Sequence, residues 1–561
     1  MVRFSAFLAG LPLADLALAT GTVSLSLEKR AILDGRPQPV KGIYKRQQSD
    51  AGTVESTVYD VLPWSLGGAY YTNISVGTPP QTLTVILDTG SSDLYVDASS
   101  SQACKDTSSP TTCRGGSFDP GSSTTYSVAV SNGFNTSFGD GSTATGDFGR
   151  DTISFGDVVV SGVQFGVASD VQSTTGFAVS LMGVGYAANE ASSREYPNMP
   201  EVLRQAGAIN SRLYSVFLNQ VGDATGTILF GGIDTSKYTG QLQTMNMLPV
   251  TLQDRSGRDS LEEVFEFLVS VTGVSARASG QTTTFLSGGD PDAGRNSGSL
   301  RVLLDTGSTA WTVPPSYYNR LTRLFGNSID SHGYMECSHQ NDDVTITIEF
   351  GGKVSIDVPA KSLVIPVYDP ANNLQLTTTT GQPLCTFLIS PDTNNQQQNS
   401  NGFLTLGDAV LRSMYVVFDM DNAQISIAQA NPNAPTDASS SGSGDNIKVV
   451  QAGPSGVAQA VGSANGGVAT VAQNSYSIAA EVTASQSMSF ATASSAIGTA
   501  TGTFAIPQAG QVTPGALETS QAATTSTGAA VSTTPTTQNG LHLTVLLTWV
   551  AMTSLGFIVF I

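Results

Sequence analysis

The chain has 561 residues, more than one hydrophobic core usually supports, so several domains or lobes are expected. Only 12% of the residues are charged, but 44 acids against 25 bases give a formal net charge of −19. This charge excludes nucleic acid as a partner, because phosphates would be repelled, and it suits a protein that works in acid.

The N-terminal end has the pattern of two removable segments. Residues 1–19 combine Arg3, an apolar stretch and a final Ala-Leu-Ala, which is typical of a cleaved signal peptide. Residues 20–46 are basic and end in Lys45-Arg46, which predicts a propeptide that is cleaved after Arg46. The alternative is that this Lys-Arg pair belongs to an ordinary exposed loop.

Residues 47–430 consist of short alternating or apolar runs broken by Gly, Asn, Asp and Pro, as in YYTNISVGTPPQ and DVTITIEFGGKVSIDVPA. This spacing is typical of an all-β protein. Helical patterns are confined to brief pieces at 199–209 and 315–326. We therefore expect an all-β fold with short helices.

The tetrapeptide Asp-Thr-Gly-Ser occurs twice in this part of the chain. It begins at Asp88 in VILDTGSSDLYV and at Asp305 in RVLLDTGSTAWTV, each time after an apolar run. A lone buried carboxylate is costly, so two such groups held inward indicate chemistry. The repeat predicts two lobes, 47–248 and 249–430, with one carboxylate each and a cleft between them.

The four cysteines also fall one pair to each lobe. Cys104 and Cys113 lie in the first lobe and Cys337 and Cys385 in the second, and a secreted chain predicts a disulfide within each pair. Metal binding is the alternative, but no Cys-x-x-Cys occurs, so no metal is expected. With only three histidines in the chain, a Ser-His-Asp site is poorly supported.

Glycosylation is predicted in two regions. Asn73 and Asn135 each begin an Asn-x-Ser sequon, although single sequons often stay unused. Residues 431–528 are dominated by Ser, Thr, Ala and Gly and cannot bury enough apolar surface to offset the entropy of ordering. They are predicted to form a flexible, O-glycosylated stalk.

The C-terminal end is an uncharged apolar run at 541–561, whose length would suit a transmembrane helix. Small residues at 528–530, a polar spacer and this run are, however, typical of a glycosylphosphatidylinositol anchor signal. No Lys or Arg follows the run, which favours the anchor. We expect removal of 529–561 and a lipid on Gly528, with Ser526 as a second attachment candidate, and an extracellular protein at the plasma membrane or cell wall.

The chain resembles the pepsin-like aspartic proteases and, with its anchor signal, their fungal cell-surface, yapsin-type branch. Besides the two Asp-Thr-Gly copies, the matching segments are YYTNISVGTPPQ, FGDGS at 138–142, GTILFGGID at 226–234 and FLTLGDAVLRSMYVVFD at 403–419. The resemblance implies a bilobal fold with an active-site cleft between pseudo-symmetric lobes. It also implies a monomeric endopeptidase that cleaves proteins and peptides at acid pH without a cofactor.

By this resemblance Asp88 and Asp305 form the catalytic dyad. The ionised member activates a water, and the protonated member polarises the peptide carbonyl. The threonines of the two motifs are expected to cross-link the loops, the glycines to make room, and the serines to donate to the outer carboxylate oxygens. These supporting residues are Thr89, Gly90, Ser91, Thr306, Gly307 and Ser308.

Family members also carry a hairpin flap, usually with a Tyr before Gly, and this chain has Phe138-Gly139 there. The Trp that usually partners this Tyr is matched by Tyr95, and we hypothesise that Tyr95 supplies the hydroxyl that the flap lacks. Asp140, at the flap tip, is expected to accept a Lys or Arg on the amino side of the cut. The alternative is that Asp140 only forms a good hairpin turn with the following glycine.

The basic propeptide is expected to lie against the acidic cleft at neutral pH and to keep the precursor silent. The alternative to a protease is a non-catalytic cell-wall mannoprotein that uses the same fold as an adhesive binding module. Loss of either aspartate would favour that alternative, and both are present.

Overall fold

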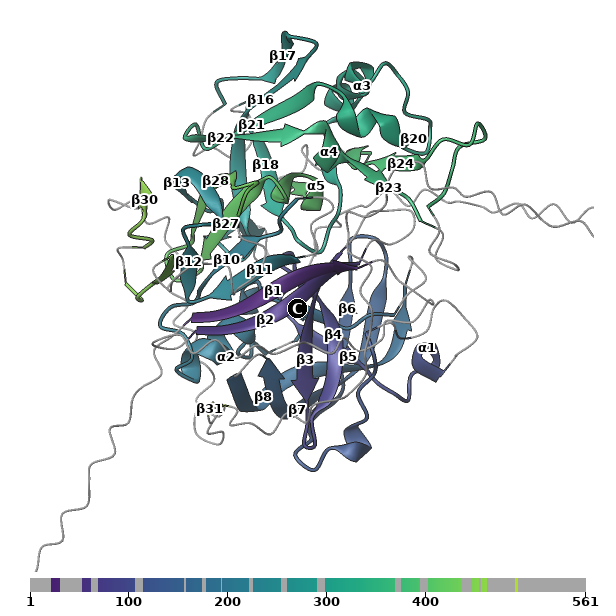
Figure 1. The fold of residues 1–561 in the computed structure, drawn as a ribbon. Helices are drawn as coiled ribbons and strands as arrows, with labels where there is room; N and C mark the ends of the chain where they lie inside the picture. The colour runs from purple at the N-terminus through teal and green to yellow at the C-terminus, as the bar shows by residue number, and fades with distance from the viewer. Residues whose placement is uncertain are drawn as a thin grey trace, which may run out of the picture.

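Figure 1 shows a computed structural model of the chain. The structure describes residues 22–30, 53–61, 69–105, 113, 115–155, 158–173, 178–192, 194–220, 225–253, 260–289, 298–368, 375–393, 402–434, 446–453, 456–461 and 490–492. The expected signal peptide, the Lys45-Arg46 cleavage pair, Gly528 and the anchor segment lie outside these ranges. Within the ranges, every helix is too short or too polar to cross a lipid bilayer.

The protein is built mainly of β-strands in two lobes, which lie one above the other in Figure 1. The larger sheet contains, in chain order, β1 (Thr22–Arg30), β2 (Thr53–Val61), β3 (Ala69–Val76), β4 (Gln81–Asp88), β5 (Leu94–Asp97), β6 (Ser127–Ser137), β7 (Thr143–Phe155), β8 (Val158–Gln172), β9 (Leu181–Gly183), β10 (Leu213–Phe217), β11 (Thr225–Phe230), β13 (Tyr238–Asn246), β27 (Met414–Asp419), β28 (Gln424–Ala430), β30 (Ala460–Val461) and β31 (Phe490–Thr492). Its strand order is β30-β13-β28-β27-β10-β11-β1-β2-β3-β4-β9-β5-β8-β7-β6, with β31 beside β8.

The second sheet forms the upper lobe of Figure 1. Its strands are β16 (Leu268–Ala278), β17 (Gln281–Leu286), β18 (Leu300–Leu304), β19 (Trp311–Val313), β21 (Val344–Phe350), β22 (Val354–Pro359), β25 (Ile389–Pro391) and β26 (Leu404–Leu406). Their order is β22-β21-β16-β18-β26-β19-β25, with β17 beside β16.

Three small sheets and five short α-helices complete the described fold. The small sheets pair β12 (Gly232–Asp234) with β29 (Ile447–Val449), β14 (Val250–Gln253) with β15 (Ser260–Glu263), and β24 (Leu384–Phe387) with both β20 (Tyr334–Glu336) and β23 (Val364–Pro366). The helices are α1 (Gln102–Lys105), α2 (Met199–Gln205), α3 (Pro315–Leu324), α4 (Ala360–Leu363) and α5 (Asp408–Leu411). The helical pieces expected at 199–209 and 315–326 are confirmed as α2 and α3.

The strands follow the alternation seen in the sequence. In β21, every second side chain from Val344 to Phe350 is buried and the others are partly exposed, as expected for a strand with one face on the core. Helix α2 begins where the Asn198 side chain accepts a hydrogen bond from the Glu201 amide, a usual N-cap. The all-β prediction with short helices is therefore confirmed.

The two Asp-Thr-Gly elements have the same surroundings in both lobes. β4, which ends at Asp88, runs parallel to β9, and β18, which precedes Asp305, runs parallel to β26. In each lobe the carboxylate thus lies at the end of a strand that is flanked on both sides by other strands of its sheet. The duplication inferred from the repeated tetrapeptide is a duplication of structure.

The lobes share a sheet and a core. Strands β27 and β28 come from the second predicted lobe, but β27 pairs with β10 and β28 with β13, in the larger sheet. The ring of Phe418 packs against Tyr214 at a centroid distance of 5.0 Å and against Phe267 at 4.7 Å. Division of the chain at 248/249 therefore separates strands that belong to one sheet.

Strand β1 falls within the expected propeptide, and it is part of the larger sheet. It pairs in parallel with β2 and antiparallel with β11. The purple strands β1 and β2 cross the middle of the molecule in Figure 1. The backbone of residues 22–30 is thus paired within a sheet, and the rest of the expected propeptide, with Lys45-Arg46, lies outside the described residues.

The covalent cross-links agree with the cysteine pattern. Cys104 is bonded to Cys113 and Cys337 to Cys385, so the disulfide prediction is confirmed and metal binding by these thiols is excluded. The sequons differ from one another in exposure. Asn135 is exposed on β6, whereas Asn73 is only 6% exposed and accepts a hydrogen bond from the Thr84 hydroxyl at 2.7 Å. We therefore correct the prediction at Asn73, because its amide has no room for a glycan.

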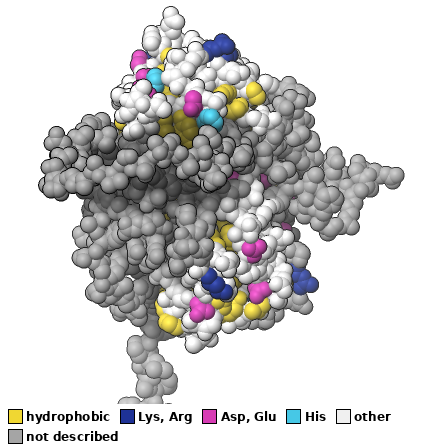
Figure 2. Space-filling model, turned by 90° about the vertical axis from the view of Figure 1, so that its right-hand side faces the viewer, with side chains coloured by type: hydrophobic (Ala, Val, Ile, Leu, Met, Phe, Trp, Pro, Cys, Tyr) yellow, Lys and Arg dark blue, Asp and Glu magenta, His cyan; other side chains and the backbone are white. Residues whose placement is uncertain are grey.

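The described surface carries few charges. Figure 2 shows one face on which most described side chains are uncharged, and the acidic and basic ones stand singly rather than in patches. This pattern agrees with the low content of charged residues in the sequence.

A buried carboxyl makes the fold sensitive to pH. Asp97, at the end of β5, is fully buried, and neither of its carboxylate oxygens has a hydrogen-bond partner among the described residues. Burial raises the pKa of this carboxyl to about 7. The folded protein therefore keeps a proton that the unfolded chain has lost, so the free energy of unfolding falls as pH rises from about 4 to about 7.

Replacement of Asp97 by Asn is expected to flatten this pH dependence, because an amide does not ionise. Thermal unfolding of both proteins at about pH 4 and about pH 7.5 should show a smaller fall in Tm for the variant. Asp170→Asn, an exposed site on β8, serves as the control and should behave like wild type. Equal falls in Tm for wild type and Asp97→Asn would contradict the prediction.

Candidate active site

The two Asp-Thr-Gly-Ser copies meet where the lobes join. Asp88 is the last residue of β4, and Asp305 directly follows β18. A Cβ added to Gly90 would lie 2.6 Å from the Asp305 carboxyl carbon, and one added to Gly307 would lie 2.5 Å from Asp88 Oδ1. Each glycine therefore lies against the carboxyl group of the other loop, where a larger residue would collide.

Thr89 and Thr306 tie the loops together crosswise. The Thr89 amide donates to Thr306 Oγ1 at 3.1 Å, and the Thr306 amide donates to Thr89 Oγ1 at 3.0 Å. The Thr89 hydroxyl donates to the Leu304 carbonyl and the Thr306 hydroxyl to the Leu87 carbonyl, both at 2.8 Å. Because both threonines are buried, these four hydrogen bonds fix the separation of the two carboxyl-bearing loops.

Each carboxylate is also held by its own loop. Asp88 Oδ1 accepts from the Gly90 amide at 2.7 Å, and the matching bond from the Gly307 amide to Asp305 Oδ1 is 2.8 Å. The outer oxygens accept from the two motif serines, Ser91 on Asp88 at 2.5 Å and Ser308 on Asp305 at 2.6 Å. The support expected from the threonines, glycines and serines is thus present in both halves with nearly equal distances.

The electrostatics of the pair favour one retained proton. Asp88 is only 5% exposed, whereas Asp305 is half-buried. Burial, and next the nearby charge of Asp305, hold the pKa of Asp88 well above its ordinary value, although the hydrogen bonds from Ser91 and Gly90 act in the opposite direction. A pair of this kind takes up one proton between its members and does not readily ionise both carboxyls.

The flap is the hairpin of β6 and β7, closed by a turn at 138–142. The Phe138 amide donates to the Ser142 carbonyl at 2.8 Å, and Gly141 has a φ of +87°, which suits glycine. Both carboxylate oxygens of Asp140 accept from Ser142, Oδ1 from its amide and Oδ2 from its hydroxyl, each at 2.8 Å. Asp140 therefore stabilises the turn, as the alternative interpretation expected, and Gly139 lies within that turn.

Tyr95 supports the flap through its ring. The ring lies 5.5 Å from that of Phe134 and 6.1 Å from that of Phe138, measured between centroids. Its hydroxyl is buried and donates to the Val179 carbonyl at 3.0 Å. The hypothesis that this hydroxyl replaces the one missing from the flap is therefore corrected: it already serves the backbone of the same lobe.

Two buried charged groups were not predicted as functional residues, although Arg412 lies in the matching segment 403–419. Glu266 precedes β16; burial raises the pKa of its carboxyl to about 7, and the charges of Arg301 and Asp305 also act on it. Arg412, which follows α5, is buried, and its Nε donates to the Tyr70 hydroxyl of β3 at 3.0 Å. Its Nη2 lies 3.6 Å from Asp408 Oδ2, so the guanidinium connects the two parts of the fold.

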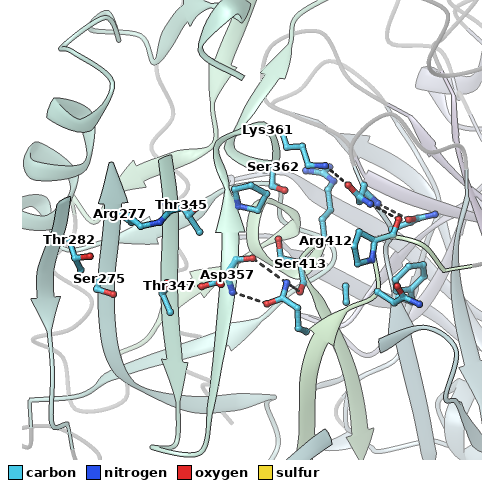
Figure 3. A pocket seen from close by; sticks show the side chains of 18 residues that line it. Ser275, Arg277, Thr282, Thr345, Thr347, Asp357, Lys361, Ser362, Arg412 and Ser413 are labelled. Carbon is cyan, nitrogen blue, oxygen red and sulfur yellow. Dashed lines mark hydrogen bonds between the residues drawn. The ribbon is translucent and has the colours of Figure 1, made fainter. Parts of the chain in front are cut away.

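A pocket of about 530 Å³ lies apart from the dyad, between β16, β21, β22 and the segment at 429–432. Figure 3 shows Thr345 and Thr347 along one wall and Lys361 and Arg412 on the other side. None of the predicted site residues lines it. The paired carboxyls are therefore the better candidate for chemistry.

Comparison with known proteins agrees with this geometry. Residues 69–430 match the family described as eukaryotic aspartyl protease. The probable aspartic-type endopeptidase OPSB of Trichophyton verrucosum is 36% identical over 389 residues, which cover 67% of this chain and 72% of the relative. The acid protease of Saccharomycopsis fibuligera is 33% identical over 390 residues, covering 69% and 85%.

A third relative, the aspartic proteinase yapsin-3 of Saccharomyces cerevisiae, is 32% identical over 372 residues, which cover 64% of this chain and 66% of that protein. The match of the family along 69–430 includes both Asp-Thr-Gly elements and the flap. The alternative of a non-catalytic adhesive module finds no support in these relatives. The chain belongs to the pepsin-like aspartic protease family and is an aspartic-type endopeptidase.

Proposed function

We propose that Asp88 and Asp305 together activate a water molecule that hydrolyses peptide bonds. The observation that carries this proposal is the mutual packing of each motif glycine against the carboxyl of the other loop. It leaves the two carboxyls facing each other with one proton to share. General acid and general base are then available within one site, which is what amide hydrolysis requires.

In the proposed reaction the ionised carboxyl takes a proton from water as the water oxygen bonds to the peptide carbonyl carbon. The protonated carboxyl gives its proton to the carbonyl oxygen, which forms a neutral tetrahedral diol. In the second half, the carboxyl that gained the water proton passes a proton to the nitrogen, and the carbon–nitrogen bond breaks. The diol returns a proton to the dyad, so the enzyme ends as it began.

We also propose that the enzyme cleaves peptides at acid pH. The raised pKa of Asp88 keeps the single proton in place, and in acid the buried Asp97 carboxyl is neutral, so the fold avoids the cost of burying its charge. Cleavage of a peptide library by the purified protein across acid and neutral pH, with products identified by mass spectrometry, tests both points. Absence of any cleaved peptide at acid pH would contradict the proposal.

We also propose that Asp140 favours Lys or Arg on the amino side of the cut. Asp140 lies in the turn that closes the flap, and a carboxylate offers about four lone-pair sites, so it can accept from a cationic side chain of the substrate as well as from Ser142. A charged hydrogen bond there contributes about 1.5–3 kcal/mol.

Asp140→Thr is therefore expected to lower the preference for a Lys over a matched Leu peptide by about tenfold or more. The measurement is kcat/KM for both peptides with each protein. Ser142→Ala is the matched control, because it weakens the same turn but leaves the carboxylate. If Ser142→Ala lowers the preference as much as Asp140→Thr does, the turn and not the charge sets specificity.

For its location, we propose a secreted monomer that loses residues 1–46 and is held at the cell surface by a lipid on Gly528. The sequence patterns at both ends, the two disulfides and the exposed Asn135 sequon support this route. Release from intact cells by a phosphatidylinositol-specific phospholipase is the expected result. Retention after that treatment would favour a spanning segment instead.

A further inference from the structure

The sheet that the lobes share has two apolar faces, because successive side chains of a strand project to opposite sides. Tyr214 of β10 and Phe418 of β27 belong to the large core, which also contains Leu87 and Leu304, the residues before the two active-site carboxyls. Residues at alternate positions along these strands, with side chains of β12, β13 and β28, form a second core on the other face: Leu213, Phe217, Ile233, Leu242, Tyr415, Val417, Ala428 and Ala430. The face opposite to the catalytic core therefore needs a cover of its own.

Residues 446–461 lie on this face and are held there by backbone pairing. β29 pairs antiparallel with β12, and β30 pairs in parallel with β13. The Val450 amide donates to the Gly231 carbonyl at 2.9 Å, and the Thr235 amide donates to the Asn446 carbonyl at 3.0 Å, so the pairing continues beyond both ends of β29. Two strands of the first lobe thus hold the segment.

Two valines of the segment enter the second core. Val450 and Val457 are only 5% and 3% exposed, and both belong to that core. Val449 and Val461, in the same segment, are 37% and 46% exposed. Burial of one valine beside exposure of the next shows that the segment keeps one face on the body, as a strand of the fold does.

The segment also contacts the second lobe, and it lies beyond the family match. The side-chain amide of Asn422, in the turn between β27 and β28, donates to the Gly453 carbonyl at 3.1 Å and to Asp419 Oδ2 at 2.7 Å. The match to the aspartyl protease family ends at residue 430, and composition placed residues 431–528 in a stalk. The cover of the shared sheet thus comes from a part of the chain that neither the match nor the composition assigned to the enzyme.

We propose that residues 446–461 are a C-terminal clasp, an intramolecular partner that the outer face of the shared sheet requires. The folded body of this protease then extends past residue 430 to Val461. Without the clasp, the second core would lie at the surface, and an apolar face of that kind favours association with other molecules. Because strands of both lobes form this sheet, the clasp stabilises the common base on which the two carboxyl-bearing loops rest.

The first test compares two double variants of the full-length chain. Val450→Ser with Val457→Ser removes the buried pair, and Val449→Ser with Val461→Ser makes the same change at the exposed pair. Thermal unfolding should show a Tm lower by about 5 °C or more for the buried pair, because apolar contacts are lost and hydroxyls are buried. The exposed pair should lower Tm by about 2 °C or less.

The second test replaces residues 438–444 by the recognition sequence of a site-specific protease in the same full-length proteins. After cleavage, size-exclusion chromatography should show the C-terminal piece bound to the body in wild type and in the exposed-pair variant. The piece should separate from the body in the buried-pair variant. If that variant does not fold, Val457→Ala alone should give a smaller fall in Tm and faster separation of the piece than in wild type.

Two outcomes would overturn the proposal. One is an equal fall in Tm for the buried and exposed pairs, which would mean that Val450 and Val457 are not seated in the core. The other is loss of the cleaved piece from the wild-type body with no change in its Tm, which would mean that the sheet does not need this cover.

Discussion

Asp88→Asn is expected to lower kcat roughly 10³- to 10⁴-fold, because the pair can no longer act as acid and base in turn. The carbonyl oxygen of the introduced amide can still accept a hydrogen bond from Gly90 or Ser91, so the loop geometry should persist. Asp305→Asn should cost about as much, since the two halves of the site are held by equivalent bonds. Steady-state cleavage of one peptide at the acid optimum is the measurement.

The same variant should gain stability near neutral pH, which separates its chemistry from misfolding. The pKa of Asp88 is raised in the folded protein, so the fold is favoured when this carboxyl is protonated and loses stability as pH rises. The substitution by Asn removes that loss. An inactive variant with a higher Tm than wild type at about pH 7 would support the assignment, and one that keeps a tenth of wild-type activity would refute it.

The largest loss of stability is expected from Arg412→Met. The guanidinium is buried between Tyr70 of β3 and Asp408 of α5, and the Asp408 side chain is fully buried. Removal of one member of a buried charge pair typically costs about 3–5 kcal/mol, because the other charge loses its counterion in a low-dielectric site. Thermal or denaturant unfolding measures the effect.

The double variant Arg412→Met with Asp408→Asn provides the control. Because it also removes the carboxylate, it should be less destabilised than the sum of the two single variants. Arg412→Lys keeps the charge but not the hydrogen bond from Nε to Tyr70, so it should lie between wild type and Arg412→Met. If Arg412→Met unfolds at the wild-type temperature, the guanidinium does not hold these parts together.

Local patterns predicted the parts of the site that lie within one stretch of chain. The repeat of Asp-Thr-Gly-Ser located Asp88 and Asp305, and alternation in segments such as 344–350 indicated the strands. The roles of the motif glycines and serines followed because their partners are two or three residues away. The crosswise threonine bonds were expected from the resemblance to the aspartic proteases, not from a local pattern.

Features that depend on distant pairing were missed or misjudged. Nothing in the sequence around Glu266 marks it, because the charges that act on its carboxyl, those of Arg301 and Asp305, come from a distant part of the chain. The burial of Asn73 depends on how β3 sits between its neighbours, which a sequon does not report. The Tyr95 hydroxyl was assigned to the flap because the sequence shows Tyr95 in place of the usual Trp. Its acceptor is the backbone carbonyl of Val179, and no sequence pattern indicates which backbone carbonyl lies near a given side chain.

The position of β1 has a consequence for maturation. The hydrogen bonds that pair β1 with β2 and β11 do not depend on the peptide bond after Arg46. Cleavage after Arg46 would separate residues 22–30 covalently from the rest of the protein but leave them paired between β2 and β11. The cleaved protein would then be a complex of two chains. Dissociation of that short chain would expose the unpaired edges of β2 and β11. Removal of the segment would then be limited by dissociation and not by proteolysis.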